Sequence, residues 1–204
     1  MGSHGLVGVT ANAGSDSGTD QIPFLAAEVM GLARDDILMH LRFFAPVLAV
    51  LPPRERPGLG GFAGTGQFCL YDSRHVLKCY QEEPGLVVRS YLHMLLHGIF
   101  FHPFQYRKLE RDIWDLAADL AVENVILELG LKGTALPWDK NLGRELAVME
   151  DKAGGLTAEA LYRYFIKNPL PPEEGRRLRS RFYRDVHAFW EEKQPGPVLV
   201  LPAC

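Results

Sequence analysis

Apolar residues recur at helical spacing along much of the chain, and this pattern predicts most of its secondary structure. Between Pro23 and about Val50 they follow one another at three- and four-residue intervals. Such spacing places them on one face of a helix. We therefore expect one or two helices here, with a break near Gly31 or Pro46, the residue types that interrupt helices most readily.

Further helices are predicted over residues 86–101, 110–129, 157–167 and 173–193. Pro103 closes the first of them, and Gly130 is a favourable stop for the second. Thr157 suits the N-cap of the third, because its hydroxyl can accept a hydrogen bond from the first turn. The stretch 132–155 has no comparable pattern and is expected to be irregular.

Extended segments are few and short. Residues 52–66 are rich in glycine and proline, which predicts a loop. Two runs follow, Gln67–Tyr71 and His75–Gln81, and the sequence Asp72–Arg74 between them suits a turn. A β-hairpin is therefore expected. Together with the helices it predicts an α+β fold that is mostly helical and contains a small β-hairpin or sheet.

The organisation of the chain indicates one globular domain. Residues 1–21 are rich in Gly, Ser, Thr and Asp and are expected to be disordered, residues 22–194 to form the domain, and residues 195–204 a tail. A length of 204 residues is sufficient for a single core. Apolar and charged residues make up 47% and 23% of the chain, which is typical of an ordinary soluble protein.

Charge and cysteine content narrow the functional classes. A net charge of −3 gives no general attraction to nucleic acid or to an anionic membrane, and neither is expected as a partner. The longest apolar region, 22–52, carries too many charged residues to span a bilayer. Three cysteines indicate no disulfide framework, so a reducing, cytoplasmic location is expected.

Three of the seven histidines, His93, His97 and His102, lie close together in the chain. A helix would place His93 and His97 on one face, one turn apart. This is the arrangement of the metalloprotease zinc helix, His-Glu-x-x-His, except that Met94 stands in place of the glutamate. The alternative is a set of core histidines bonded to neighbours. Burying several imidazoles costs free energy unless each has a partner, and a metal ion is a common one.

A third metal ligand has two candidates. His102 lies five residues after His97, about 140° off the helix face, and reaches the site only if the helix ends or bends first. Asp119 lies on one face of the next predicted helix together with Asp115 and Glu123. If none of them is a ligand, the three form an acidic stripe that is exposed to water. The alanines around Asp119 would let two helices approach closely. Two histidines, one carboxylate and an open position form a catalytic zinc site, and the same donors suit iron.

Several motifs occur in a characteristic order around the histidine helix. They comprise Gly64-Thr65-Gly66 with Leu70-Tyr71, then Trp114, Ala117 and Asp119, then Thr157, Ala158, Glu159 and Tyr162, and finally Asp185, His187 and Trp190. With these residues the chain resembles a bacterial zincin-like metallopeptidase domain family that is often found N-terminal to a von Willebrand factor A-like domain. The resemblance covers roughly residues 24–190.

The resemblance implies a zincin-like fold in which a small β-hairpin or sheet packs on the metal-binding helix. It also implies that His93 and His97 hold a zinc ion, with Asp119 or His102 completing the site. Asp119 is the favoured third ligand, since in some zincins a carboxylate from a following helix has this role.

Met94 is the main departure from that family. The glutamate that it replaces takes a proton from zinc-bound water and passes it to the leaving amine, and methionine can do neither. Loss of a positioned general base typically lowers the rate by about 10²–10⁴. Glu123 and His187 are candidates for a replacement base, although a structural role is expected for each.

The sequence therefore predicts a zinc-binding, metallopeptidase-like domain, catalytically impaired, that acts in peptide or protein binding. Two alternatives stay open. One is an active zinc metallopeptidase with a non-standard base, and the other is a metal-free structural or partner-binding module. From the family resemblance, a von Willebrand factor A-like domain or an ATPase is an expected partner.

Overall fold

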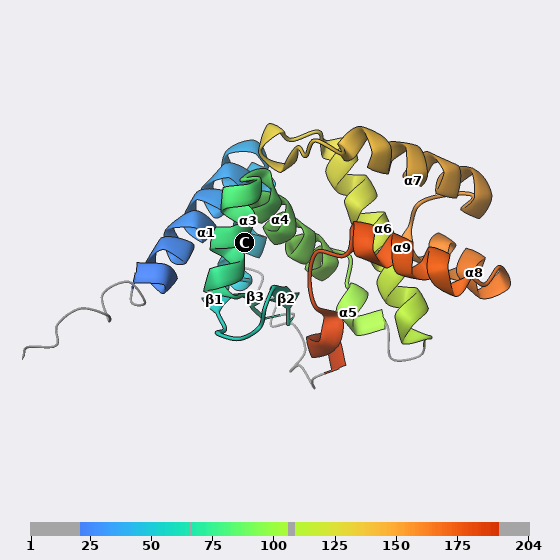
Figure 1. The fold of residues 1–204 in the computed structure, drawn as a ribbon, viewed down its shortest axis with the longest axis horizontal. Coiled ribbons are helices and arrows are strands. Elements are labelled where there is room, and N and C mark those ends of the chain that lie inside the picture. The colour runs from blue at the N-terminus through green and yellow to red at the C-terminus, as the bar shows by residue number, and fades with distance from the viewer. Residues whose placement is uncertain (1–20, 66, 106–108, 192–204) are drawn as a thin grey trace, which may run out of the picture.

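The computed structural model describes residues 21–65, 67–105 and 109–191 (Figure 1). The described part is mostly helical and contains a small three-stranded sheet, which confirms the predicted α+β class. The segments expected to be disordered or to form the tail, 1–21 and 195–204, lie outside it apart from Gln21, the first residue of α1. None of the helices described has both the length and the apolar character needed to cross a membrane.

The described part of the chain contains α-helices, short 3-10 turns and three strands. The α-helices are α1 (Gln21–His40), α2 (Ala45–Val50), α3 (Ser73–Glu82), α4 (Gly85–Ile99), α5 (His102–Gln105), α6 (Arg111–Leu129), α7 (Asp139–Ala153), α8 (Ala158–Lys167) and α9 (Pro172–Phe182). The 3-10 turns are η1 (Arg42–Phe44), η3 (Lys132–Thr134) and η4 (His187–Glu191). The strands are β1 (Pro53–Glu55), β2 (Phe62–Gly64) and β3 (Cys69–Tyr71).

The sheet has the order β1-β3-β2 and lies against α4. Strand β1 runs parallel to β3, with Arg54 opposite Leu70, and β2 runs antiparallel to β3, with Ala63 opposite the same residue. Strands β2 and β3 therefore form a hairpin, and β2 is an edge strand. This edge matters below, because the C-terminal part of the chain passes along it.

The predicted hairpin of residues 67–71 and 75–81 is wrong in its second strand. Residues from Ser73 onward form α3, because the Asp72 side chain caps the helix by accepting hydrogen bonds from the backbone N–H groups of Arg74 and His75, at 3.0 and 3.2 Å. The strands that pair with β3 instead come from the segment 52–66, which was predicted as a loop.

Three predictions of where helices form and end also need correction. The stretch 132–155 is not irregular, since α7 forms there and buries one apolar face. The predicted helix 173–193 ends at Phe182, and the chain then runs without regular structure to η4. The first helix passes through Gly31 and breaks at Leu41, while Pro46 sits in the first turn of α2, where its missing N–H is tolerated.

Two apolar clusters fill the described part, and α6 contributes to both. The first combines α1 to α4 and the sheet with Val122 and Ile126 of α6. The second combines α7, α8 and α9 with the N-terminal half of α6 and with Trp190. Figure 1 shows the two groups on either side of the α4–α6 pair. Polar side chains between these two helices are therefore enclosed by apolar packing.

Candidate metal centre

Helices α4 and α6 bring two pairs of polar side chains face to face. His93 and His97 lie one turn apart on α4, and Asp119 and Glu123 lie one turn apart on α6. Asp119 Oδ1 lies 3.2 Å from His93 Nε2 and 3.4 Å from His97 Nε2. The alanines beside Asp119 are buried and have almost no side-chain volume, which allows this close approach.

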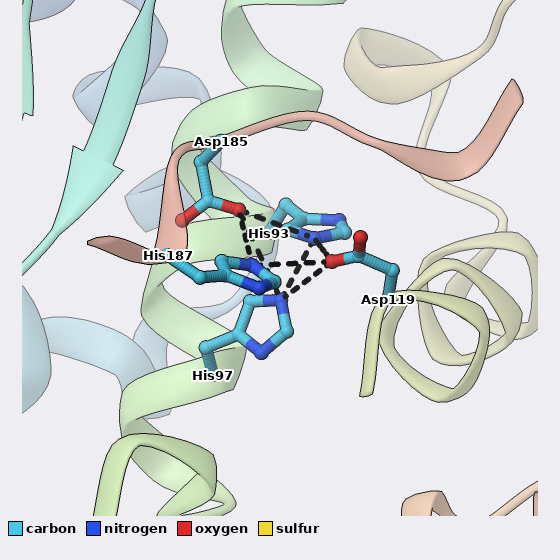
Figure 2. Close-up of side chains that lie close together, drawn as sticks. All are labelled: His93, His97, Asp119, Asp185 and His187. Carbon is cyan, nitrogen blue, oxygen red and sulfur yellow. Dashed lines mark hydrogen bonds and ion pairs between the residues drawn. The ribbon is translucent and has the colours of Figure 1, made fainter. Parts of the chain in front are cut away.

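The chain that follows α9 supplies the other side of the cluster. Asp185, at a bend, and His187, the first residue of η4, both point into it (Figure 2). The backbone N–H of Val186 donates to the carbonyl oxygen of Phe62 in β2, at 2.7 Å. The His187 ring stacks on Trp190, with centroids 3.8 Å apart. The segment is thus fixed to the sheet edge while its two polar side chains enter the cluster.

Five potential ligand atoms converge at this point. His93, His97, Asp119, Asp185 and His187 each offer one, and all five atoms lie within 4.8 Å of one another. His187 Nε2 lies 3.2 Å from the Oδ1 atoms of both aspartates. Ligands bonded to an ion at 2.0–2.1 Å are separated by about 3.0–3.4 Å, which is close to these values. All five residues are between 0% and 6% exposed, so this buried group could hold a metal ion.

Each histidine of the cluster has a second partner on its outer nitrogen. Nδ1 of His93 lies 2.9 Å from Glu123 Oε1, and Nδ1 of His97 lies 2.9 Å from Nδ1 of His102. Nδ1 of His187 faces Asp115 Oδ1 at 3.4 Å. Metal-bound histidines almost always have such a partner, because it fixes the ring orientation and the tautomer. All three imidazoles therefore present Nε2 to the centre.

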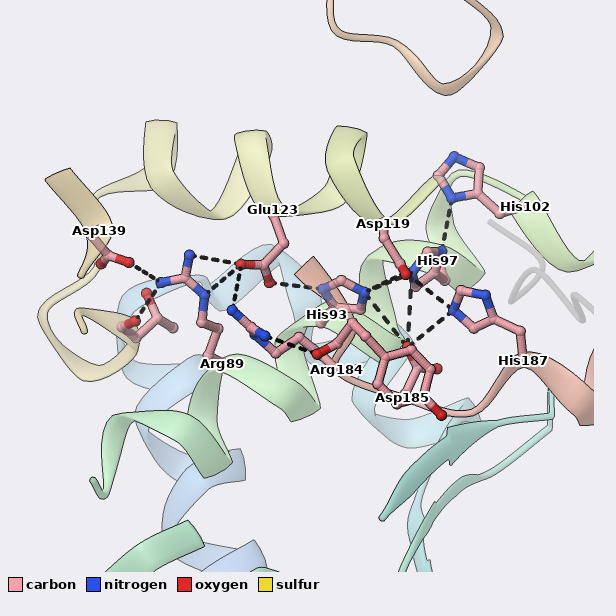
Figure 3. A network of polar contacts seen from close by, with 12 residues as sticks. Arg89, His93, His97, His102, Asp119, Glu123, Asp139, Arg184, Asp185 and His187 are labelled. Atoms are coloured by element: carbon pink, nitrogen blue, oxygen red, sulfur yellow. Dashed lines mark hydrogen bonds and ion pairs between the residues drawn. The ribbon is translucent and has the colours of Figure 1, made fainter. Parts of the chain in front are cut away.

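A buried ion-pair network continues outward from Glu123 (Figure 3). The fully buried Arg89 donates from Nε to Glu123 Oε2 at 2.9 Å, and from Nη1 to Asp139 Oδ1 at 2.8 Å and the carbonyl oxygen of Thr134 at 3.0 Å. Arg184 Nη2 approaches the same Glu123 oxygen at 3.4 Å. Glu123 is therefore held by cations on one side and directs its other oxygen to His93.

The ionisation of the cluster without a cation follows from this crowding. Burial lowers the pKa of His93, but the hydrogen bonds to Asp119 and Glu123 outweigh it and raise the value to about 9. Burial also opposes the charged form of His187, yet Asp119 and Asp185 raise its pKa well above the ordinary value. At His97 the hydrogen bond to Asp119 does not outweigh burial, which lowers the pKa to about 4.

The carboxyl groups respond in the opposite direction. Burial alone would raise the pKa values of Asp119 and Asp185, but the neighbouring His187 lowers both, with the larger fall at Asp119. The hydrogen bond to His93 and the charge of Arg184 likewise hold the pKa of Glu123 at about 2. Carboxylates that stay ionised in a buried site are suitable ligands for a cation.

The structure brings most of the predicted site residues together. Asp119 faces the centre, whereas His102 lies behind His97 and contacts the nitrogen turned away from it. Of the two candidate bases, His187 contributes a possible ligand atom, while Glu123 is bonded behind His93. Met94 is only 2% exposed and packs in the first apolar cluster.

Sequence reasoning did not identify Asp185 as a ligand, nor Arg89 as part of the network. Asp185 was noted as part of a family motif and not as a ligand, and residues 173–193 were predicted to be helical. On a helix, residues 185 and 187 would point in directions about 200° apart, so no shared site was apparent. Arg89 lies one turn before His93, and that spacing was the available signal.

No protein-family model, curated protein or solved structure matches the chain in the comparisons made. The resemblance to the zincin-like family therefore remains a prediction from sequence motifs.

Proposed function

We propose that this protein is a zinc-binding, metallopeptidase-like protein that lacks efficient peptide hydrolysis and acts in peptide or protein binding. The observation that supports the metal is the convergence of five buried ligand atoms from three separate segments. A second support is that each of the three imidazoles has an orienting partner on its outer nitrogen.

The donor set favours zinc among the common metals. Three imidazole nitrogens and two carboxylate oxygens suit a borderline cation, whereas calcium and magnesium prefer oxygen donors alone. Iron accepts the same donors and is the second choice. The two aspartates would balance the charge of a divalent ion. The imidazoles would be kept in place by Glu123, His102 and Asp115.

The same geometry argues against hydrolysis. A catalytic zinc site usually has three protein ligands and an open position for water. Here five residues face the centre and all are buried. Methionine stands where the family has its glutamate base, and Glu123 is held between His93 and Arg89, which prevents it from replacing that base.

A bound ion would connect parts of the chain that are distant in sequence. His93 and His97 belong to α4, Asp119 to α6, and Asp185 and His187 to the end of the segment after α9 and the start of η4. In the described structure the contacts that hold this part of the chain include the Val186 backbone hydrogen bond, the Arg184–Glu123 contact and the packing of Trp190. The ion would therefore close the C-terminal segment over the α4–α6 pair.

X-ray absorption spectroscopy of the zinc-loaded protein tests this proposal. We expect a shell of four or five nitrogen and oxygen neighbours at about 2.0–2.1 Å, with outer scattering from three imidazoles and no sulfur. A sulfur shell, or scattering from a single imidazole, would place the zinc elsewhere and contradict the proposal.

The ligand assignment predicts an order of effects among single substitutions. Asp185→Ala and His187→Ala should each weaken zinc binding more than His102→Ala, because the first two remove atoms that face the centre. Loss of an outer partner such as His102 typically costs about 10–100-fold in metal affinity. Competition with a chromophoric chelator measures all three constants. The reverse order would make His102 a ligand and exclude the present arrangement.

Met94→Glu is expected to leave peptidase activity at background. The new carboxylate would be buried in the first apolar cluster and would lower the free energy of unfolding by about 3 kcal/mol. Urea denaturation and a fluorogenic peptide assay measure the two effects. Met94→Leu, which conserves volume, serves as the control and should cost less than about 1.5 kcal/mol. Zinc-dependent hydrolysis gained by the glutamate variant would show that an open position exists.

A further inference from the structure

A pocket of about 470 Å³ lies next to the metal centre. It is bounded by the residues that follow α4, by the middle of α6, and by the junction of α7 with α8. The half-buried Val125 and Leu156, together with the partly exposed Phe100, give it an apolar lining that we call the floor. Small-molecule sites have volumes of about 300–1,000 Å³, so this pocket can admit one amino-acid side chain with its adjoining backbone.

The rim of the pocket is acidic. Glu128 of α6, Glu150 of α7 and Glu159 of α8 all line it and are exposed at its edge. Asn124 donates from its side-chain amide to Glu128 Oε1 at 2.9 Å, which orients one of the carboxylates. Among the described residues that line the pocket there is no lysine or arginine. An apolar floor below an uncompensated acidic rim favours a cation carried on an apolar stem.

His102 provides a second, independent indication of a ligand. Its ring lines the pocket and is only 4% exposed. Nδ1 is occupied by the contact with His97, whereas Nε2 has no hydrogen-bond partner among the described residues (Figure 3). Because the ring lines the pocket and this nitrogen has no partner among the described residues, Nε2 is available to hydrogen-bond to a polar atom of an occupant.

We propose that this pocket binds an organic cation on an apolar stem, namely a guanidinium or alkylammonium group such as an arginine or lysine side chain carries. The glutamates would receive the cationic group, the floor would receive the stem, and His102 Nε2 would hydrogen-bond to a polar atom beside it. His102 contacts the metal cluster through His97, whereas the three glutamates are not part of that cluster, so binding does not require the metal. An occupant bonded to His102 Nε2 would nevertheless be separated from His97 only by the ring of His102.

Titration of the full chain with matched peptides tests the inference. The probes are acetyl-Gly-Arg-Gly-amide, its citrulline counterpart, in which a neutral urea replaces the guanidinium, and the free amine agmatine. Calorimetry gives the affinities, and the ring resonances of His102 report contact. The variant Glu128→Gln/Glu150→Gln/Glu159→Gln removes the rim charge. The control Glu28→Gln/Glu82→Gln/Glu173→Gln makes the same change in net charge on exposed residues outside the pocket.

We expect the arginine peptide to shift the His102 resonances and to bind at least about tenfold more tightly than the citrulline peptide. The rim variant should lose about tenfold in that affinity, and the control less than about twofold. Binding of agmatine as tight as that of the peptide would identify a free amine as the ligand, and weaker binding a peptide. Equal binding of both peptides, or equal effects of the two triple variants, would overturn the inference.

The same titration separates this inference from the proposed function. It is performed with and without zinc. A chain that takes up no zinc but still shows the His102 shift with the arginine peptide would contradict the metal proposal alone. A chain that binds zinc but shows no shift would contradict the pocket proposal alone.

Discussion

The His97→Ala variant is expected to bind zinc more than about a hundredfold more weakly than the wild-type chain, because loss of a ligand should exceed the 10–100-fold cost of losing an outer partner. His97 places Nε2 2.8 Å from His93 Nε2, at the middle of the cluster. The substitution removes that atom and also leaves His102 Nδ1 without its partner. Dialysis against a zinc buffer followed by elemental analysis measures the loss.

His40→Ala is the matched control for this prediction. His40 is an exposed histidine at the end of α1, and its Nδ1 contacts the backbone oxygen of Asp36 at 2.8 Å, within its own helix. Its removal should leave the zinc content unchanged. Full zinc occupancy in His97→Ala would remove the metal site from α4.

Arg89→Met should lower the free energy of unfolding of the metal-free protein by about 3–5 kcal/mol. Arg89 is fully buried and is bonded to the carboxylates of Glu123 and Asp139, so its loss leaves Oε2 of the buried Glu123 with only the weaker Arg184 contact. Urea denaturation in the presence of a chelator measures the change without a contribution from metal. Arg144→Met, an exposed arginine of α7, should change it by less than about 0.5 kcal/mol.

A double variant identifies the cause of this loss. Adding Glu123→Gln to Arg89→Met removes the uncompensated charge and should recover part of the stability. Zinc affinity should still fall about 10–100-fold, because Glu123 orients His93. If the double variant is no more stable than Arg89→Met, packing rather than charge determines the role of Arg89.

The central helices and three cluster residues, His93, His97 and Asp119, were predictable because their sequence signals are local. Helices α4, α6 and α8 have regular apolar spacing, and Thr157 caps α8 as expected, accepting a hydrogen bond from the backbone of Ala160 at 3.2 Å. The i, i+4 spacing of His93 and His97 placed both rings on one face. The carboxylate of Asp119 was expected opposite them because of the small residues around it.

The C-terminal half of the cluster was not predictable from local signals. The sequence around Phe182 contains neither glycine nor proline, so nothing local indicates that α9 ends there. The chain leaves the helix where tertiary contacts become available, namely the Val186 hydrogen bond to β2 and the buried positions of Asp185 and His187. The short strands β1 and β2 have the same origin, because three-residue strands depend on their neighbours in the sheet.

Elemental analysis of the wild-type chain after equilibration with zinc and exhaustive dialysis tests directly whether the protein holds a metal ion. We expect about one zinc per chain, since the ligand atoms are already assembled and buried in the described structure. Less than about a tenth of a zinc or iron ion per chain would contradict it. In that case His93, His97 and His187 would be core residues of a metal-free protein.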